Sequence, residues 1–286
     1  MAFEILNSAA ITPHRLHALV RLVSRLKEPK REDVLNMLQP ASLISNQDTS
    51  KTVYNAARLY NLIDDSEGVV RLVVDRDQIE SVRGFQRFMQ RILTGITDEQ
   101  ENDHLLNIYT AWYAVQNEQV LTLERKNFES QFNEQVYPGV EERQFNTTKF
   151  NGWRTWAAFL GWGRLMKIST FEILLPDASV RIEPLLDDLL PDEAQLVPFD
   201  DVAQRLAEAC PELDGGTLFE YCWQASRGDE QRGKRLSLML STALRILHDH
   251  KQIKLVRQPD AMQRWQLYPA MGHPVREVSH IRRRKA

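Results

Sequence analysis

The chain has 286 residues, 43% hydrophobic and 26% charged, so it can bury the cores of about two or three domains of ~100 residues each. This composition excludes a disordered chain, and the lack of any run of about 18 apolar residues excludes a membrane span. The first residues do not have the pattern of a signal peptide, and two cysteines provide neither a disulfide framework nor a zinc site, so we expect a cytoplasmic protein.

The net charge of −3 conceals an uneven distribution of charged residues. Residues 98–142 contain ten acidic residues and two basic ones, whereas residues 227–286 contain fourteen Lys and Arg and five Asp and Glu. The overall negative charge argues against unspecific coating of nucleic acid. The basic C-terminal third could still hold a phosphate backbone.

Three helices and a hairpin are predicted for the first unit, residues 1–76. Thr12 can cap a helix that begins at Pro13, and further helices are expected at 31–38 and 50–62. The turn DDSEG and the β-branched run 69–74 then indicate a hairpin. Three helices that lead into a hairpin are typical of a winged helix-turn-helix domain.

A helical block with strong apolar periodicity is predicted for residues 79–136. It leads into a second copy of the pattern, with a helix from Thr147 to a glycine stop and strands at 165–175 and 179–182. We therefore expect a second domain, residues 77–184, that combines this helical block with a second winged helix.

The last part of the chain is predicted to form a third winged helix, residues 199–270, after an acidic linker, residues 185–198. Helices are expected at 199–209, 217–226 and 236–250, followed by a hairpin of strands 253–256 and 264–268, and residues 271–286 read as a basic tail. The fold class is therefore mainly α (α+β), with tandem winged helix-turn-helix domains and a helical middle block.

Basic and amide side chains on the outward faces of these units are the candidate DNA contacts. Lys51, Asn55 and Arg58 recur at i, i+4 and i+7, so one helix face offers groups that suit phosphates and base edges. A solvated face on a protein-binding domain remains the alternative, and a disordered tail is the alternative for the C-terminal arginines. The full predicted set is Lys51, Asn55, Arg58, Lys149, Asn151, Arg154, Arg164, Lys167, Arg232, Lys234, Arg235, Arg282, Arg283 and Arg284.

The helix predicted at 236–250 is apolar around most of its circumference. Such a helix is buried, so we expect it to pack against another domain or to support a homodimer through the C-terminal winged helix. The tryptophans at 153, 156 and 162 have helical spacing, which favours core packing over base stacking.

No segment has the pattern of a catalytic, metal or cofactor site. The sequence GDEQRGKR resembles a phosphate-binding loop, but Arg235 stands where that loop needs Ser or Thr, and no strand precedes it. His248 and His250 have no further ligands nearby, and the carboxylates show no nuclease arrangement. We therefore expect a protein that is not an enzyme and that holds no metal or cofactor.

The segment WRTWAAFLGWGRLMK, followed by FEILLPDASVRI, within repeated helix-and-hairpin units resembles the DpdG-like family. These are small winged-helix subunits of bacterial anti-phage clusters that place 7-deazapurines in DNA. The resemblance implies a non-catalytic subunit that binds double-stranded DNA or acts as an adaptor for helicase, ATPase or nuclease partners.

Two other functions fit the same elements. The units also resemble the tandem winged-helix subunits that bind the kleisin of chromosome-condensing complexes, which would make the chain a protein-interaction scaffold. A transcriptional regulator is the third alternative. Basic residues gathered on one surface would favour DNA binding, whereas basic residues that scatter or pair with carboxylates would favour a scaffold.

Overall fold

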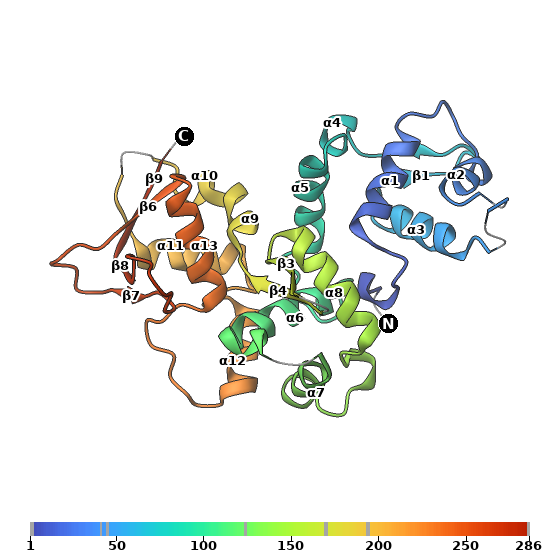
Figure 1. Cartoon of the computed structure of the whole chain (residues 1–286). Helices are drawn as coiled ribbons and strands as arrows, with labels where there is room; N and C mark the ends of the chain where they lie inside the picture. Colours follow the sequence, from blue (N-terminus) through green and yellow to red (C-terminus); the bar gives the residue numbers. More distant parts are fainter. Residues whose placement is uncertain are drawn as a thin grey trace.

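The computed structural model describes residues 3–40, 42–43, 46–122, 125–168, 171–192 and 195–284. The chain is mainly helical with small antiparallel sheets, which confirms the predicted α+β class. An N-terminal group of elements, a central helical block and a C-terminal group follow one another along the sequence (Figure 1). Buried hydrophobic side chains form one contiguous cluster that extends from Ile5 to Ile281.

The N-terminal group contains three helices and a short hairpin. Its elements are the 3-10 helix η1 (Ile5–Asn7), α1 (Pro13–Val23), α2 (Arg31–Leu38), α3 (Asp48–Leu59), β1 (Ile63–Asp64) and β2 (Arg71–Leu72). Thr12 caps α1 as predicted, since its hydroxyl accepts the amide hydrogen of Arg15 at 3.3 Å. The antiparallel pairing of β1 with β2 confirms that a hairpin follows the third helix.

The central block is built around one helix that is buried on every side. Its elements are α4 (Arg76–Ile79), α5 (Val82–Leu93), α6 (His104–Val115), η2 (Asn117–Leu121), α7 (Arg125–Gln135), η3 (Glu141–Arg143) and α8 (Thr147–Leu160). All residues of α6 are buried, and it packs against α8 and against α12 (Thr217–Arg227) of the C-terminal group. The prediction of a helical block at 79–136 is confirmed.

A hairpin follows α8, but it lies earlier in the sequence than predicted. Strands β3 (Gly163–Ile168) and β4 (Phe171–Pro176) pair along their whole length. The strand expected at 179–182 is wrong, because Ser179–Ile182 forms the helix α9. The carboxylate of Asp177 accepts the amide hydrogen of Ser179 at 2.8 Å, which turns the chain into a helix directly after β4.

The C-terminal group combines short and long helices with a small sheet. Its remaining elements are η4 (Glu183–Leu185), α10 (Leu186–Leu189), β5 (Val197–Pro198), α11 (Phe199–Ala209), α13 (Leu238–Asp249), β6 (Ile253–Val256), β7 (Trp265–Gln266), β8 (Glu277–Val278) and β9 (His280–Arg283). The segment expected to be an acidic linker is packed, since Leu186, Leu189 and Leu190 are buried.

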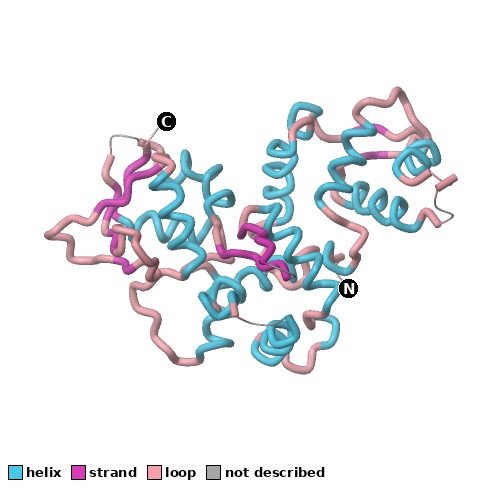
Figure 2. Tube along the Cα trace, in the orientation of Figure 1, coloured by secondary structure: helices cyan, strands magenta, loops and turns pink. Residues whose placement is uncertain are grey.

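The order of strands in this sheet differs from the predicted hairpin. Strand β9 lies between β5 and β6, and β7 pairs with β8 instead of β6. Figure 2 shows in magenta how short the strands of this part of the molecule are. The pairing of 253–256 with 264–268 is therefore wrong, because β6 places Leu255 opposite Ile281, where both side chains are buried. The predicted basic tail is also wrong, because Arg282 and Arg283 belong to β9.

Two predictions about burial are confirmed. Helix α13 packs against α9 and β4, so its apolar surface is covered within the chain. Trp153, Trp156 and Trp162 are buried and belong to the core. Among the described residues, no helix combines the length and the apolar character needed to cross a membrane.

Candidate nucleic-acid interface

The outward face of α3 carries Lys51, Asn55 and Arg58, all of which are exposed. The opposite face of this helix is buried, mainly against α1, so packing in the N-terminal group fixes which side chains point outward. Within the described part of the chain, the side chains of Lys51 and Asn55 have no hydrogen-bond or ion-pair partner. A cation and an amide are therefore available to a ligand, one helical turn apart.

Arg58 on the same face is held by the hairpin that follows α3. Its Nε lies 2.8 Å from Oδ1 of Asp65, and the Tyr54 hydroxyl donates to Oδ2 of Asp65 at 2.9 Å. Burial, together with this hydrogen bond, raises the pKa of Tyr54, so the hydroxyl stays protonated and keeps donating. Arg58 is thus a fixed cation whose side chain is still 50% exposed.

A groove of about 410 Å³ runs beside this face, between α2 and α3. Arg31 lines it from α2 and lies over the Tyr54 ring, with 5.2 Å between the guanidinium carbon and the ring centroid. Gln47 donates to Oδ1 of Asn36 at 2.6 Å across the same groove. Lys51 and Arg31 therefore place a cation on each of the two helices that border the groove, and Glu32 of α2 places one carboxylate there.

The second predicted face, on α8 and its hairpin, is largely neutralised. Arg154 lies 3.1 Å from the carboxylate of Glu172, and Arg164 lies 2.6 Å from the buried carboxylate of Asp177. Asn151 and Lys167 are exposed. The chain thus supplies carboxylate partners for two of the cations that were predicted to meet phosphates.

Lys149 does not belong to this exposed face, contrary to the sequence-based expectation. Its side chain is buried, and its Nζ donates to the carbonyl oxygens of Glu142 at 2.6 Å and Gln144 at 3.0 Å. Burial lowers its pKa. A phosphate cannot reach this ammonium without opening the loop before α8, so its role is structural.

The C-terminal cations are also engaged within the chain. Arg232 pairs with Asp214 and Glu220, Lys234 pairs with Asp200, and Arg283 pairs with Asp187. Arg282 and Arg284 are half-buried, whereas Arg235 is exposed. Lys285, the last cation of the predicted tail, lies outside the described residues.

The predicted contacts do not gather on one surface. Helix α3 lies at one end of the molecule, and the C-terminal group that carries residues 232–235 and 282–284 lies toward the other (Figure 1). Of the three predicted faces, only that of α3 keeps cationic and amide side chains outward in one compact group. By the criterion of charge placement, the scattered and paired cations favour the scaffold, and the face of α3 is the predicted contact surface that stays available to DNA.

An arginine stripe on α5 was missed by the sequence reasoning. Arg83, Arg87 and Arg91 are exposed and recur every four residues, so they lie on one side of the helix. Arg87 and Arg91 line a cleft of about 630 Å³ that is closed on its far side by Arg283 and by the segment around Glu183. The i, i+4, i+8 spacing was visible in the sequence and could have indicated this stripe.

The described residues contain no group of three or more His, Cys, Asp or Glu side chains that could hold a metal ion. His248 instead accepts the amide hydrogen of Leu255 through Nδ1 at 3.1 Å, which links the end of α13 to β6.

A family model described as DpdG-like matches residues 3–261 of the chain, which is most of its length. No curated protein matches the chain. No solved structure matches it either.

Proposed function

Because the chain belongs to the DpdG-like family, we propose that it is a non-catalytic subunit of the bacterial Dpd anti-phage defence system and contacts double-stranded DNA through its N-terminal group. The observation that carries the DNA contact is the outward face of α3, where Lys51 and Asn55 are exposed beside Arg58. A lysine suits a phosphate, and an asparagine can pair with the edge of an adenine in the major groove.

The order of elements in the N-terminal group supports this assignment. Three helices followed by the hairpin β1–β2 have the order of a winged helix, in which the third helix enters the major groove. Arg31 at the start of α2 would then lie near the backbone that flanks the groove. Few phosphate contacts are available on this face, so we expect modest affinity with a shallow salt dependence.

The rest of the chain would serve as an adaptor in this proposal. The cations of α8 and of the C-terminal group are largely paired with carboxylates of the chain, which suits a rigid body that holds partners. A scaffold that contacts only other defence proteins, such as a helicase, ATPase or nuclease, is the second candidate. The scattered and paired positive charge favours it over extended DNA binding.

Fluorescence anisotropy with a random duplex of about 30 base pairs tests the DNA contact. We expect binding that weakens with salt by roughly 0.9 log units per phosphate contact per log unit of salt. Lys51→Glu should abolish this binding, and Asn55→Ala should change it less in random sequence. Arg276→Glu is the matched control, because Arg276 is an exposed arginine of the C-terminal group that, like Lys51, has no ion-pair partner among the described residues.

If Lys51→Glu and Arg276→Glu weaken duplex binding equally, the change in net charge alone accounts for the lost affinity. That result would contradict the α3 interface. No binding of the wild-type protein at low salt would favour the scaffold. Co-expression with the other proteins of the gene cluster and co-purification through an affinity tag would then identify the partner.

A further inference from the structure

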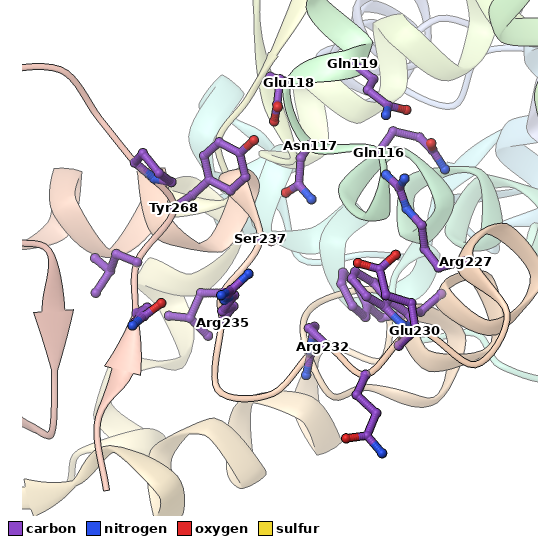
Figure 3. A pocket seen from close by; sticks show the side chains of 17 residues that line it. Gln116, Asn117, Glu118, Gln119, Arg227, Glu230, Arg232, Arg235, Ser237 and Tyr268 are labelled. Atoms are coloured by element: carbon purple, nitrogen blue, oxygen red, sulfur yellow. Dashed lines mark hydrogen bonds between the residues drawn. The ribbon is translucent and has the colours of Figure 1, made fainter.

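A pocket of about 430 Å³ lies between the central block and the C-terminal group (Figure 3). Helix α12, which contributes to its wall, lies away from α3 (Figure 1). It is bordered by η2, by the end of α12, by the loop that joins α12 to α13 and by the segment after β7. Its volume is within the range of small-molecule sites, which span roughly 300–1,000 Å³. None of the predicted functions accounts for this pocket.

Three arginines line this pocket: Arg227, Arg232 and Arg235. Arg232 is held by Asp214 at 3.4 Å and Glu220 at 3.2 Å, and it lies over the Phe219 ring. In the described part of the chain, neither Arg227 nor Arg235 has an ion-pair partner. Two arginines without an ion-pair partner among the described residues therefore border one cavity.

Two carboxylates, Glu118 and Glu230, also line the pocket, and with Arg232 paired to Asp214 and Glu220 they balance the formal charge of Arg227 and Arg235. Figure 3 shows Arg235 and Arg227 on two sides of the cavity, with Asn117 on the wall between them. An anion placed between the two arginines would be attracted by both, and planar guanidinium groups suit the oxygens of a phosphate.

The N-terminus of α13 borders the pocket, but its donors are already used within the chain. Ser237, which caps α13, lines the pocket, and its amide and hydroxyl donate to the buried carboxylate of Asp214, each at 2.6 Å. Asn117 has a left-handed φ of 54°, and its Oδ1 accepts the amide hydrogen of Leu238 at 2.7 Å. A side-chain oxygen from η2 thus already occupies one of the donors at this helix end.

The aromatic side chains of Phe219 and Trp223 also line the pocket. The rings of Phe219 and Trp223 are stacked at 17°, with 6.3 Å between their centroids. The indole of Trp223 donates to the carbonyl oxygen of Glu230 at 2.9 Å, which holds the loop against α12. Phe219 is fully buried and Arg232 covers its ring, so the half-buried Trp223 is the member of this pair that can offer a face to the flat ring of a nucleobase.

We propose that this pocket binds a phosphate ester of about mononucleotide size, with Arg227 and Arg235 on the phosphate and Trp223 beside the base. The loop has the sequence that resembles a phosphate-binding loop, but a helix precedes it where that loop follows a strand. The phosphate would therefore be held by guanidinium groups instead of a backbone cradle. The proposal does not rest on DNA binding by α3.

Two sources of this chemistry are distinguished by calorimetric titration of the whole protein. One arm uses inorganic phosphate, AMP and ATP at an ionic strength kept constant with sodium chloride. The other arm uses a duplex with and without a 5′-phosphate, on a Lys51→Glu background that removes the proposed α3 contact. Each arm is repeated with Arg227→Gln and Arg235→Gln, and with Arg76→Gln in the N-terminal half as control.

We expect each pocket substitution to raise Kd by about tenfold, which is the loss of one charge-assisted hydrogen bond, and the control to leave it unchanged. Arginine-dependent binding of AMP or ATP would identify a free nucleotide, and such binding of the phosphorylated duplex alone would identify a nucleic-acid end. Absence of heat with every phosphate compound, or equal Kd values in wild type and both pocket variants, would overturn the proposal. Circular dichroism of each variant confirms that it is folded.

Discussion

Arg181 and Glu212 form a buried ion pair, with 3.0 Å between Nε of the arginine and Oε1 of the glutamate. The indole of Trp162 also donates to this oxygen at 2.9 Å, and Arg181 donates to the carbonyl oxygen of Ala209 at 2.9 Å. The pair therefore joins the β3–β4 hairpin and α9 to the end of α11. It fixes how the central block meets the C-terminal group.

Removal of either partner of this pair is expected to destabilise the protein strongly. Arg181→Met or Glu212→Leu leaves one buried charge without compensation, which costs about 3–5 kcal/mol. The double replacement should lose much less than the sum of the two, because no buried charge remains. Urea unfolding of the four proteins measures this coupling, and additive losses would show that the two groups do not interact.

Lys149→Met is expected to lower the free energy of unfolding without changing the affinity for duplex DNA. The carbonyl oxygens of Glu142 and Gln144 lose their donor, at a cost of about 1–3 kcal/mol. Lys51→Met should do the reverse, with unchanged stability and weaker duplex binding, because Lys51 is exposed and unpaired among the described residues. Parallel measurement of unfolding and anisotropy separates the two lysines. Weaker duplex binding by folded Lys149→Met would show that its ammonium does reach DNA.

Stability is expected to fall as the pH rises from about 4.5 to about 8, owing to Glu4. Burial raises the pKa of Glu4 to about 8, although its carboxylate accepts the amide hydrogen of Leu105 at 3.1 Å. The folded state therefore holds a proton that the unfolded state has released, and the stabilisation present at low pH is lost as the pH approaches 8. Asp103, whose pKa burial raises to about 6, acts in the same direction.

Glu4→Gln should flatten this dependence, because the amide does not titrate. Denaturant unfolding at about three pH values between 6 and 8.5 measures the slope, and Glu101→Gln, at an exposed position, is the control. A wild-type slope in Glu4→Gln would assign the pH dependence to other groups.

Gly161→Ala is expected to destabilise the protein far more than Gly68→Ala. Both glycines have a left-handed φ, 85° and 81° respectively, so each alanine is strained by about 1 kcal/mol. Only at Gly161 would the new Cβ lie 2.7 Å from Val180 and 2.8 Å from the amide nitrogen of Arg181. Thermal unfolding of the two variants compares strain alone with strain plus overlap, and equal shifts in Tm would refute the close approach.

Local signals in the sequence were reliable where a cap or an apolar periodicity determines an element. Thr12 with Pro13 gave the start of α1, and the predicted range of α11 matches Phe199–Ala209. The spacing of the tryptophans at 153 and 156 also indicated their burial, since aromatic side chains on one face of a helix pack inward.

These local signals could not predict which distant strands pair or which charged side chains become buried or ion-paired. The alternation of residue types in β6 is compatible with pairing to 264–268 or to β9. The pairing with β9 depends on the burial of Ile281 beside Leu255. Lys149 has the sequence context of an exposed cation, yet the loop at 142–144 folds over it. Arg154 and Arg164 face Glu172 and Asp177 only because the hairpin folds back, so their neutralisation could not be read from helical spacing.

The place of β9 between β5 and β6 has a consequence for how the molecule is made. Val197 in β5 pairs with Ile281 in β9, because β5 does not pair with β6 directly. Strand β5 therefore cannot enter the sheet until β9 is present. Closing so long a loop carries an entropy cost, and non-local strand pairing slows folding. During synthesis the C-terminal sheet can therefore form only after its middle strand leaves the ribosome, whereas the N-terminal helices can fold from local contacts well before then.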